Sequence, residues 1–252
     1  MRLATVALGA LLAGGSAAGP AAAEGGWLEI GGERAGVSIG ESAWWAGRVE
    51  AAIRREGRGG ASLTVEPLAR FGMRDVALGA AGYRIAGPWT MSARVGHTPG
   101  ADFSPALALE GEVARRLVGT WVGHAGYRLL RFPGATVHVI SPAATWYGSR
   151  GEVHVRGYVS RNATAGTSGD ALLLQASWQV SSRVRMLAGA SRGERIFDFA
   201  PLSDRPAPGY VVFAGARLRA TVRDTVGIDV RVAGEQPGFR QRAFGLSYRR
   251  SF

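Results

Sequence analysis

Alternation of apolar and polar residues, in steps of two, runs through most of the chain after residue 26. Runs of about ten residues are separated by Gly, Pro, Asp, Asn or Ser. Successive side chains of a strand point to opposite faces, so each run predicts a strand with one apolar and one polar face. We expect strands near 27–37, 44–55, 61–71, 76–85, 89–96, 105–117, 121–132, 136–147, 151–160, 171–180, 184–191, 210–221, 226–232 and 239–252.

The segment 44–55 separates the two faces clearly. Val49 and Ile53 lie on the apolar face, whereas Arg48 and Glu50 lie on the charged face. Other segments alternate less regularly, and the ends of predicted strands are the least certain part of such a pattern. Twelve strands is therefore the alternative to fourteen, because three segments alternate poorly: 27–37, 76–85 and 136–147.

Two kinds of all-β protein fit these amphipathic strands. In a soluble sandwich the apolar faces would pack together, and in a transmembrane barrel they would face lipid. Many segments approach the roughly 9–11 residues that a tilted strand needs to cross a membrane. Their apolar faces carry many Ala, Gly and Val residues, which suit lipid better than a tightly packed core. We therefore predict a single antiparallel up-and-down transmembrane β-barrel, with a soluble periplasmic sandwich as the alternative.

The connections between the predicted strands alternate between tight and long. Tight breaks occur at 148–150 and 181–182, whereas 97–104, 162–170 and 192–209 are long. Outer-membrane barrels have short periplasmic turns and longer external loops. If both termini are periplasmic, every long connection falls outside. Whether the 192–209 connection folds inward as a plug is left open by the pattern.

The first residues have the composition of an export signal. Arg2 is followed by an apolar run at 3–12, and Ala21-Ala22-Ala23 fits an A-x-A cleavage site. We therefore predict a signal peptide at 1–23 and a barrel domain at 24–252, in the outer membrane of a Gram-negative bacterium.

The last strand ends in an aromatic residue. Its alternating outer face, Phe244, Leu246, Tyr248 and Phe252, is similar to the C-terminal signature that the barrel-assembly machinery recognises. Arg250 departs from the usual apolar residue of that signature. An arginine near the membrane interface can extend its guanidinium toward the headgroups, so the departure is compatible with the signature.

Composition excludes several other classes of protein. The chain has no Cys, so disulfides and thiolate metal sites are excluded. After the predicted signal peptide, no stretch approaches the ~18 uncharged apolar residues of a membrane-spanning helix. The net charge is +11 and every basic residue other than His is Arg, but these arginines are dispersed among Glu and Asp. Dispersed charge forms no continuous phosphate-binding stripe, which argues against nucleic-acid binding.

The charged faces of the strands predict the lining of the lumen, because charges are costly against lipid. The favoured interpretation is a ladder of salt bridges that fills the lumen and stiffens the barrel. The more specific alternative is a passage that prefers anions. The side chains expected to face the lumen are Arg48, Glu50, Arg54, Glu66, Arg70, Glu110, Glu112, Arg116, Arg128, Glu152, His154, Arg156, Arg185, Arg217, Arg219, Asp229 and Arg231.

Catalytic motifs are scarce. Neither G-x-S-x-G nor a paired-histidine zinc motif occurs, and the four histidines fall in different segments. The best candidate group is His154 with Glu152 and Ser160 on one strand face. His154 and Ser160 are about 20 Å apart along an extended strand, so they cannot meet directly. We therefore interpret His154 as a wall residue, and predict no catalytic residue, metal or cofactor.

Four short motifs resemble those of one family of outer-membrane proteins. In order along the chain they are Arg70-Phe71-Gly72, Gly126-Tyr127-Arg128, Trp146-Tyr147-Gly148 and Arg156-Gly157-Tyr158. Their order is similar to that in the YaiO-type outer-membrane β-barrel family. The resemblance implies location and fold, but it supplies neither a substrate nor catalytic residues.

The expected function is that of a non-enzymatic barrel, structural or porin-like, which could prefer anions or serve export of an envelope polysaccharide. The alternative is an outer-membrane enzyme that modifies lipid or glycan. The partners expected are outer-membrane lipid and the barrel-assembly machinery, together with small anions or an envelope polysaccharide.

Overall fold

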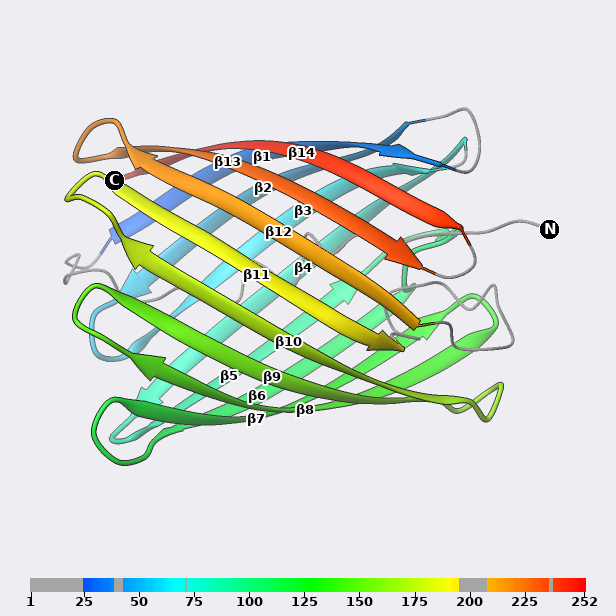
Figure 1. The fold of residues 1–252 in the computed structure, drawn as a ribbon, viewed down its shortest axis with the longest axis horizontal. Coiled ribbons are helices and arrows are strands. Elements are labelled where there is room, and N and C mark those ends of the chain that lie inside the picture. The colour runs from blue at the N-terminus through cyan, green and yellow to red at the C-terminus, as the bar shows by residue number, and fades with distance from the viewer. Residues whose placement is uncertain (1–24, 39–42, 71, 195–207, 236–237) are drawn as a thin grey trace.

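Fourteen β-strands and no helix make up the described part of this computed structural model (Figure 1). The structure describes residues 25–38, 43–70, 72–194, 208–235 and 238–252, so the predicted signal peptide lies outside them. Within these ranges no helix is long and apolar enough to cross a membrane. In chain order the strands are β1 (Gly25–Val37), β2 (Trp44–Arg55), β3 (Gly59–Arg70), β4 (Met73–Ala86), β5 (Trp89–His97), β6 (Leu107–Arg116), β7 (Trp121–Phe132), β8 (Ala135–Tyr147), β9 (Gly151–Asn162), β10 (Ser168–Gln179), β11 (Val184–Glu194), β12 (Pro208–Arg219), β13 (Asp224–Glu235) and β14 (Phe239–Ser251).

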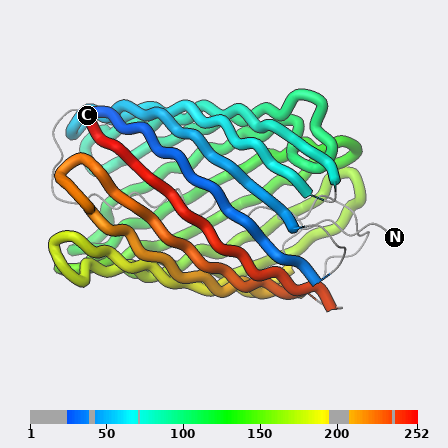
Figure 2. Tube along the Cα trace, turned by 90° about the horizontal axis from the view of Figure 1, so that it is seen from above, coloured from blue at the N-terminus to red at the C-terminus, as the bar shows by residue number. Residues whose placement is uncertain are grey.

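The strands close into one barrel in which each strand pairs antiparallel with its neighbours in the chain. The last strand closes the barrel, because β14 pairs with β1 from Gln241 to Ser251 (Figure 2). Gly26 and Phe252 exchange two backbone hydrogen bonds of 3.0 Å at this seam. The predicted barrel of fourteen strands is thus confirmed. The twelve-strand count and the soluble sandwich are wrong, and the three poorly alternating segments are strands β1, β4 and β8.

The apolar rows of the strands form the outer wall. On β2, Ile53 is 63% exposed and Val49 41% exposed, whereas the side chains of Arg48 and Glu50 are only 17% and 13% exposed. Leu63 on β3 is 66% exposed. These apolar side chains do not pack against one another across a core, so they present a continuous apolar surface such as a membrane barrel offers to lipid.

The two ends of the barrel differ in their connections. At one end, here called the turn end, the strands are joined by the tight connections 56–58, 87–88, 117–120, 148–150, 180–183 and 220–223. The start of β1 and the C-terminus also lie there. The opposite end, here called the loop end, carries the longer connections 98–106 and 163–167. The long connection predicted at 192–209 also joins two strands at the loop end, but residues 195–207 lie outside the described part of the chain.

The inner face of the barrel carries two chemically distinct regions. An apolar cluster lies toward the loop end on the side formed by β7 to β13, and comprises Leu130, Phe132, Ala135, Val137, Val139, Tyr158, Ala171, Leu173, Val211, Phe213 and Ala233. Buried Arg70 and Asp75 also lie toward the loop end, and Arg231 is the register partner of Phe213. The rest of the inner face, called the charged level, lies mainly nearer the turn end and carries ion pairs. The wall thus separates lipid-facing apolar rows from a charged interior.

Candidate functional site

A belt of arginines and carboxylates lines the charged level of the lumen and joins side chains from most of the strands. We call this set the inner belt. Seven of its arginines form ion pairs with eight carboxylates. The pairs are Arg48 with Glu50 and Glu66, Arg128 with Glu110, Arg156 with Glu112, Arg185 with Glu152, Arg217 with Asp229, Arg231 with Glu33, and Arg249 with Glu29.

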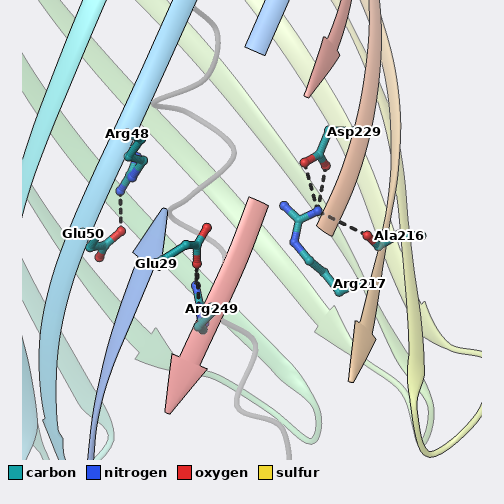
Figure 3. Close-up of polar contacts among 7 residues, drawn as sticks. All are labelled: Glu29, Arg48, Glu50, Ala216, Arg217, Asp229 and Arg249. Carbon is teal, nitrogen blue, oxygen red and sulfur yellow. Dashed lines mark hydrogen bonds and ion pairs between the residues drawn. The ribbon is translucent and has the colours of Figure 1, made fainter. Parts of the chain in front are cut away.

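Strand pleating creates some of these pairs directly. Arg48 and Glu50 are two residues apart on β2, so both point inward, and Arg48 Nη2 lies 2.6 Å from Glu50 Oε2 (Figure 3). Arg48 Nη1 also donates to Glu66 Oε1 on β3 at 3.0 Å. One guanidinium therefore binds two carboxylates from adjacent strands.

Other pairs join adjacent strands of the barrel. Arg217 on β12 donates from Nη1 to both carboxylate oxygens of Asp229 on β13, at 3.0 and 2.9 Å (Figure 3). At the seam, Arg249 on β14 donates from Nε to Glu29 Oε2 on β1 at 2.6 Å (Figure 3). Hydrogen bonds between ionised partners are stronger than neutral ones, so the Arg249–Glu29 contact helps hold the first and last strands together.

The most connected part of the inner belt is a ring of five side chains. His124 Nδ1 lies 3.0 Å from Glu112 Oε1, and His124 Nε2 lies 3.0 Å from Thr145 Oγ1. Thr145 Oγ1 lies 2.8 Å from His154 Nδ1, and Arg156 Nε donates to His154 Nε2 at 3.2 Å. An ion pair of 2.6 Å between Arg156 Nη2 and Glu112 Oε2 closes the ring.

The partners of the ring fix the direction of two of its hydrogen bonds. The Glu112 carboxylate can only accept, so His124 donates to it from Nδ1. The Arg156 guanidinium can only donate, so His154 accepts at Nε2. The Thr145 hydroxyl can both donate and accept, so it links the two imidazoles.

The candidate catalytic group of His154, Glu152 and Ser160, disfavoured by the sequence, does not come together. Ser160 donates to the Gly169 carbonyl oxygen at 2.9 Å, and Glu152 binds Ser177 and Arg185. His154 instead contacts Thr145. Glu112, His124 and Thr145 do form a chain of carboxylate, imidazole and hydroxyl. Thr145, however, lies within β8, whose backbone pairs with β7 on one side and with β9 on the other. Ladder pairing occupies the backbone N–H groups that would otherwise stabilise an oxyanion.

Most of the residues expected to face the lumen lie in the inner belt or at its edges. Arg54 and Arg116 point inward near the turn end, as does Arg219 on β12. Within the described part of the chain, none of these three forms an ion pair with a carboxylate. Inward-facing Asp, Glu, Arg and His side chains of the described strands that the sequence prediction missed are Glu29, Glu33, Asp75, Arg94, His124, Glu235 and Arg249.

Arg70 lies apart from the belt, at the loop end. Its guanidinium stacks over the rings of Trp44 and Phe103, at 5.3 and 5.2 Å from the ring centroids. Phe103 belongs to the 98–106 connection, and Asp75 on β4 anchors that connection. The Asp75 carboxylate accepts from the backbone N–H groups of residues 102, 103 and 104 at 2.9, 3.2 and 2.7 Å.

The C-terminal residues predicted as an assembly signal lie on the outer wall. Phe244, Leu246 and Tyr248 are 42–51% exposed, and Phe252 is 70% exposed. The Phe252 ring lies over Gly26, where a Cβ atom would come within 2.7 Å of it. Recognition by the assembly machinery stays a prediction.

Metal chemistry finds no support in the described ranges, where no group of three or more His, Asp or Glu side chains is arranged to hold an ion. The donors of the five-residue ring are all engaged with one another. The inner belt is therefore a set of fixed charges around the lumen.

Solved structures with similar folds are membrane channels and porins. The CymD monoaromatic hydrocarbon channel has a TM-score of 0.64 and 9% sequence identity, and the match covers 92% of this chain and 89% of that chain. The NanC porin has a TM-score of 0.58 at 10% identity, covering 88% and 98%. The KdgM porin, determined with disordered oligogalacturonate, has a TM-score of 0.51 at 9% identity, covering 89% and 99%. At these identities the likeness establishes the fold alone.

No curated protein matches the chain in sequence. A family model does: the YaiO membrane beta barrel domain matches residues 28–189, which include the four motifs that carry the resemblance. The match and the porin-like folds indicate an outer-membrane location. The chain belongs to the YaiO membrane β-barrel family.

Proposed function

We propose that this protein is a non-enzymatic channel in the outer membrane of a Gram-negative bacterium and that it prefers small anionic solutes. The observation that carries the proposal is the charge balance of the inner belt. Eight inward carboxylates are bound by seven arginines. Arg54, Arg94, Arg116 and Arg219 also point inward. With Arg70, Asp75 and Glu235, which face inward near the loop end, the inner faces of the described strands carry twelve arginines and ten carboxylates, a balance of +2.

The four additional arginines matter because no carboxylate of the described ranges is within ion-pair distance of them. Arg94 lies opposite Glu110 in the ladder, but that carboxylate already binds Arg128 at 2.9 Å. Charged side chains around a pore set its ionic preference, and their fields are strong where the wall excludes water. Unneutralised guanidinium groups therefore favour entry of anions.

The neighbouring structures agree with a channel for small solutes. The KdgM porin was determined with oligogalacturonate, which is a carboxylated saccharide, and CymD is a channel for apolar molecules. The present chain has an apolar cluster toward the loop end, on the side formed by β7 to β13, and ion pairs nearer the turn end. An organic anion would suit both regions, because its apolar part would contact the cluster and its charged group would contact the arginines.

Planar-bilayer recording of the purified barrel tests this proposal. In a KCl gradient we expect the reversal potential to report anion preference. The triple variant R54S/R94S/R116S removes three inward charges and should lower or abolish that preference. Its matched control, R55S/R84S/R115S, removes three outward-facing arginines and should keep it. Cation preference or absence of conductance in the unmodified barrel would refute the proposal.

A lipid- or glycan-modifying enzyme is the second candidate, favoured by the contacts of Glu112, His124 and Thr145. Hydrolysis or acyl transfer on lipopolysaccharide would support it if the activity disappeared in Thr145→Val and remained in Thr64→Val, a control on the same inner face. A role in export of an envelope polysaccharide stays a prediction from the sequence.

A further inference from the structure

Arginines also occur on the outer wall, close to the loop end. Arg34 on β1 and Arg240 and Arg242 on β14 are exposed, and each lies between residues that are buried or half-buried. Pleating therefore directs all three guanidinium groups away from the lumen. We call these three residues, with Gly36 and Tyr210, the outer arginine patch.

The patch spans the seam where β14 pairs with β1, two strands that run side by side in Figure 2. Arg242 is the register partner of Gly36, and Arg34 is two residues from that glycine. A Cβ atom at Gly36 would meet nothing within 4 Å, so the surface between Arg34 and Arg242 is open. On the other side of Arg240, the Tyr210 ring lies over Gly234, the register partner of Arg240.

The position of the patch indicates what it contacts. Arg34 is the register partner of Phe244. From this pair toward the turn end, the outer face of β1 and β14 continues with Leu246, Ile30 and Leu28. These side chains are 40–52% exposed and form an apolar surface. The patch therefore lies at the border between the apolar band and the zone above it, where a membrane lipid places its headgroup.

The charges of the patch are not neutralised within the protein. Among the described residues, no carboxylate forms an ion pair with Arg34, Arg240 or Arg242. Four further exposed arginines point outward near the same end: Arg74, Arg131, Arg161 and Arg192. The acidic residues at this level of the outer wall in the described ranges, Asp170 on β10 and Glu194 on β11, lie away from the patch, which is on β1 and β14.

The turn end of the outer wall also carries exposed arginines, among them Arg55, Arg84 and Arg115. They share that end with four exposed tryptophans, Trp89, Trp121, Trp146 and Trp178, which are 39–49% exposed, and Arg115 stacks over the Trp89 ring at 5.0 Å from its centroid. Aromatic side chains suit a membrane interface whatever the charge of the lipid, whereas clustered arginines suit phosphates. The turn-end arginines therefore provide a control of equal charge for the outer arginine patch.

We propose that the outer arginine patch binds the phosphorylated headgroup of an outer-leaflet glycolipid such as lipopolysaccharide. The phosphates would contact Arg34, Arg240 and Arg242, and the acyl chains would lie on the apolar surface of β1 and β14 below. Guanidinium groups bind phosphate oxygens through paired, charge-assisted hydrogen bonds. This inference is independent of what passes through the lumen.

The test is binding of lipopolysaccharide to the folded mature barrel in detergent, measured by native mass spectrometry. The probe is compared with the same lipopolysaccharide after enzymatic removal of its lipid phosphates. The variant R34Q/R240Q/R242Q is compared with R55Q/R84Q/R115Q, which removes the same charge from the turn end of the outer wall. A mobility shift on boiling verifies that each barrel is folded.

We expect the patch variant to bind phosphorylated lipopolysaccharide roughly a hundredfold more weakly. Each arginine that an anionic lipid surface attracts contributes roughly a fivefold gain in binding, and the variant removes three of them. The turn-end control should bind about as well as the unmodified barrel, and removal of the phosphates should weaken binding as strongly as the patch variant does. If the triple variant assembles poorly, the three single substitutions provide the test, each with a roughly fivefold loss. Equal binding of the two lipid forms, or equal losses in patch and control variants, would overturn the proposal.

Discussion

Replacement of Asp75 by alanine is expected to release the 98–106 connection from the wall. The carboxylate accepts three backbone N–H groups, from residues 102, 103 and 104. Hydrogen bonds to a charged group contribute about 1.5–3 kcal/mol each, so the lower value gives about 4.5 kcal/mol for three. Each 1.4 kcal/mol is a factor of ten, so local opening should become roughly a thousandfold more frequent.

Hydrogen–deuterium exchange of the folded barrel measures that opening directly. In Asp75→Ala, amides 102–104 should exchange at least tenfold faster even after water replaces part of the lost bonding, and Asp75→Asn should give an intermediate rate. The Phe103 ring, whose centroid lies 5.2 Å from the Arg70 guanidinium carbon, should also move away from Arg70, because the backbone N–H of Phe103 donates to Asp75. Asp170→Asn is the control, because Asp170 lies on β10, away from this connection. Unchanged exchange at 102–104 in Asp75→Ala would refute the reasoning.

Three further changes should have smaller or different effects. Thr145→Val removes the hydroxyl that joins the two histidines of the ring, and should lower the free energy of unfolding in urea by about 1–3 kcal/mol. Gly189→Val should lower it by about 1–3 kcal/mol, because its Cβ would come within 2.4 Å of the Phe213 ring, whereas Gly32→Val, where the nearest atom is 3.7 Å away, should cost less. Phe252→Ala should slow assembly into membranes containing the assembly machinery, measured as the rate at which the heat-modifiable form appears.

The architecture was predictable because one physical rule repeats in every strand. A strand with lipid on one side and charged side chains on the other has a period of two. Val49, Glu50 and Ile53 show this period within a single strand, so it can be recognised before the neighbouring strands are known. Strand ends were less predictable. The segment 226–232 is observed as Asp224–Glu235, since ladder pairing with β12 and β14 continues beyond the alternating residues.

The partners of the inner side chains could not be read from the sequence. His124, Thr145 and His154 come from three strands and meet only through the registers of β7, β8 and β9. Glu29 and Glu33 were missed for another reason: glycines interrupt the alternation of β1, so its inner face is hard to distinguish. Periodicity indicates the face of a residue, but only the register gives its neighbour.

The most direct test of the account uses the absence of cysteine from the chain, which makes single introduced thiols unambiguous. Ser92 points inward on β5 and Ala93 points outward. In barrels reconstituted in liposomes, Ser92→Cys should react with water-soluble thiosulfonates, and faster with the anionic reagent than with the cationic one, while Ala93→Cys should be protected by lipid. Preferential labelling of the Ala93→Cys variant, or faster reaction of Ser92→Cys with the cationic reagent, would contradict a charged, anion-preferring lumen inside an apolar wall.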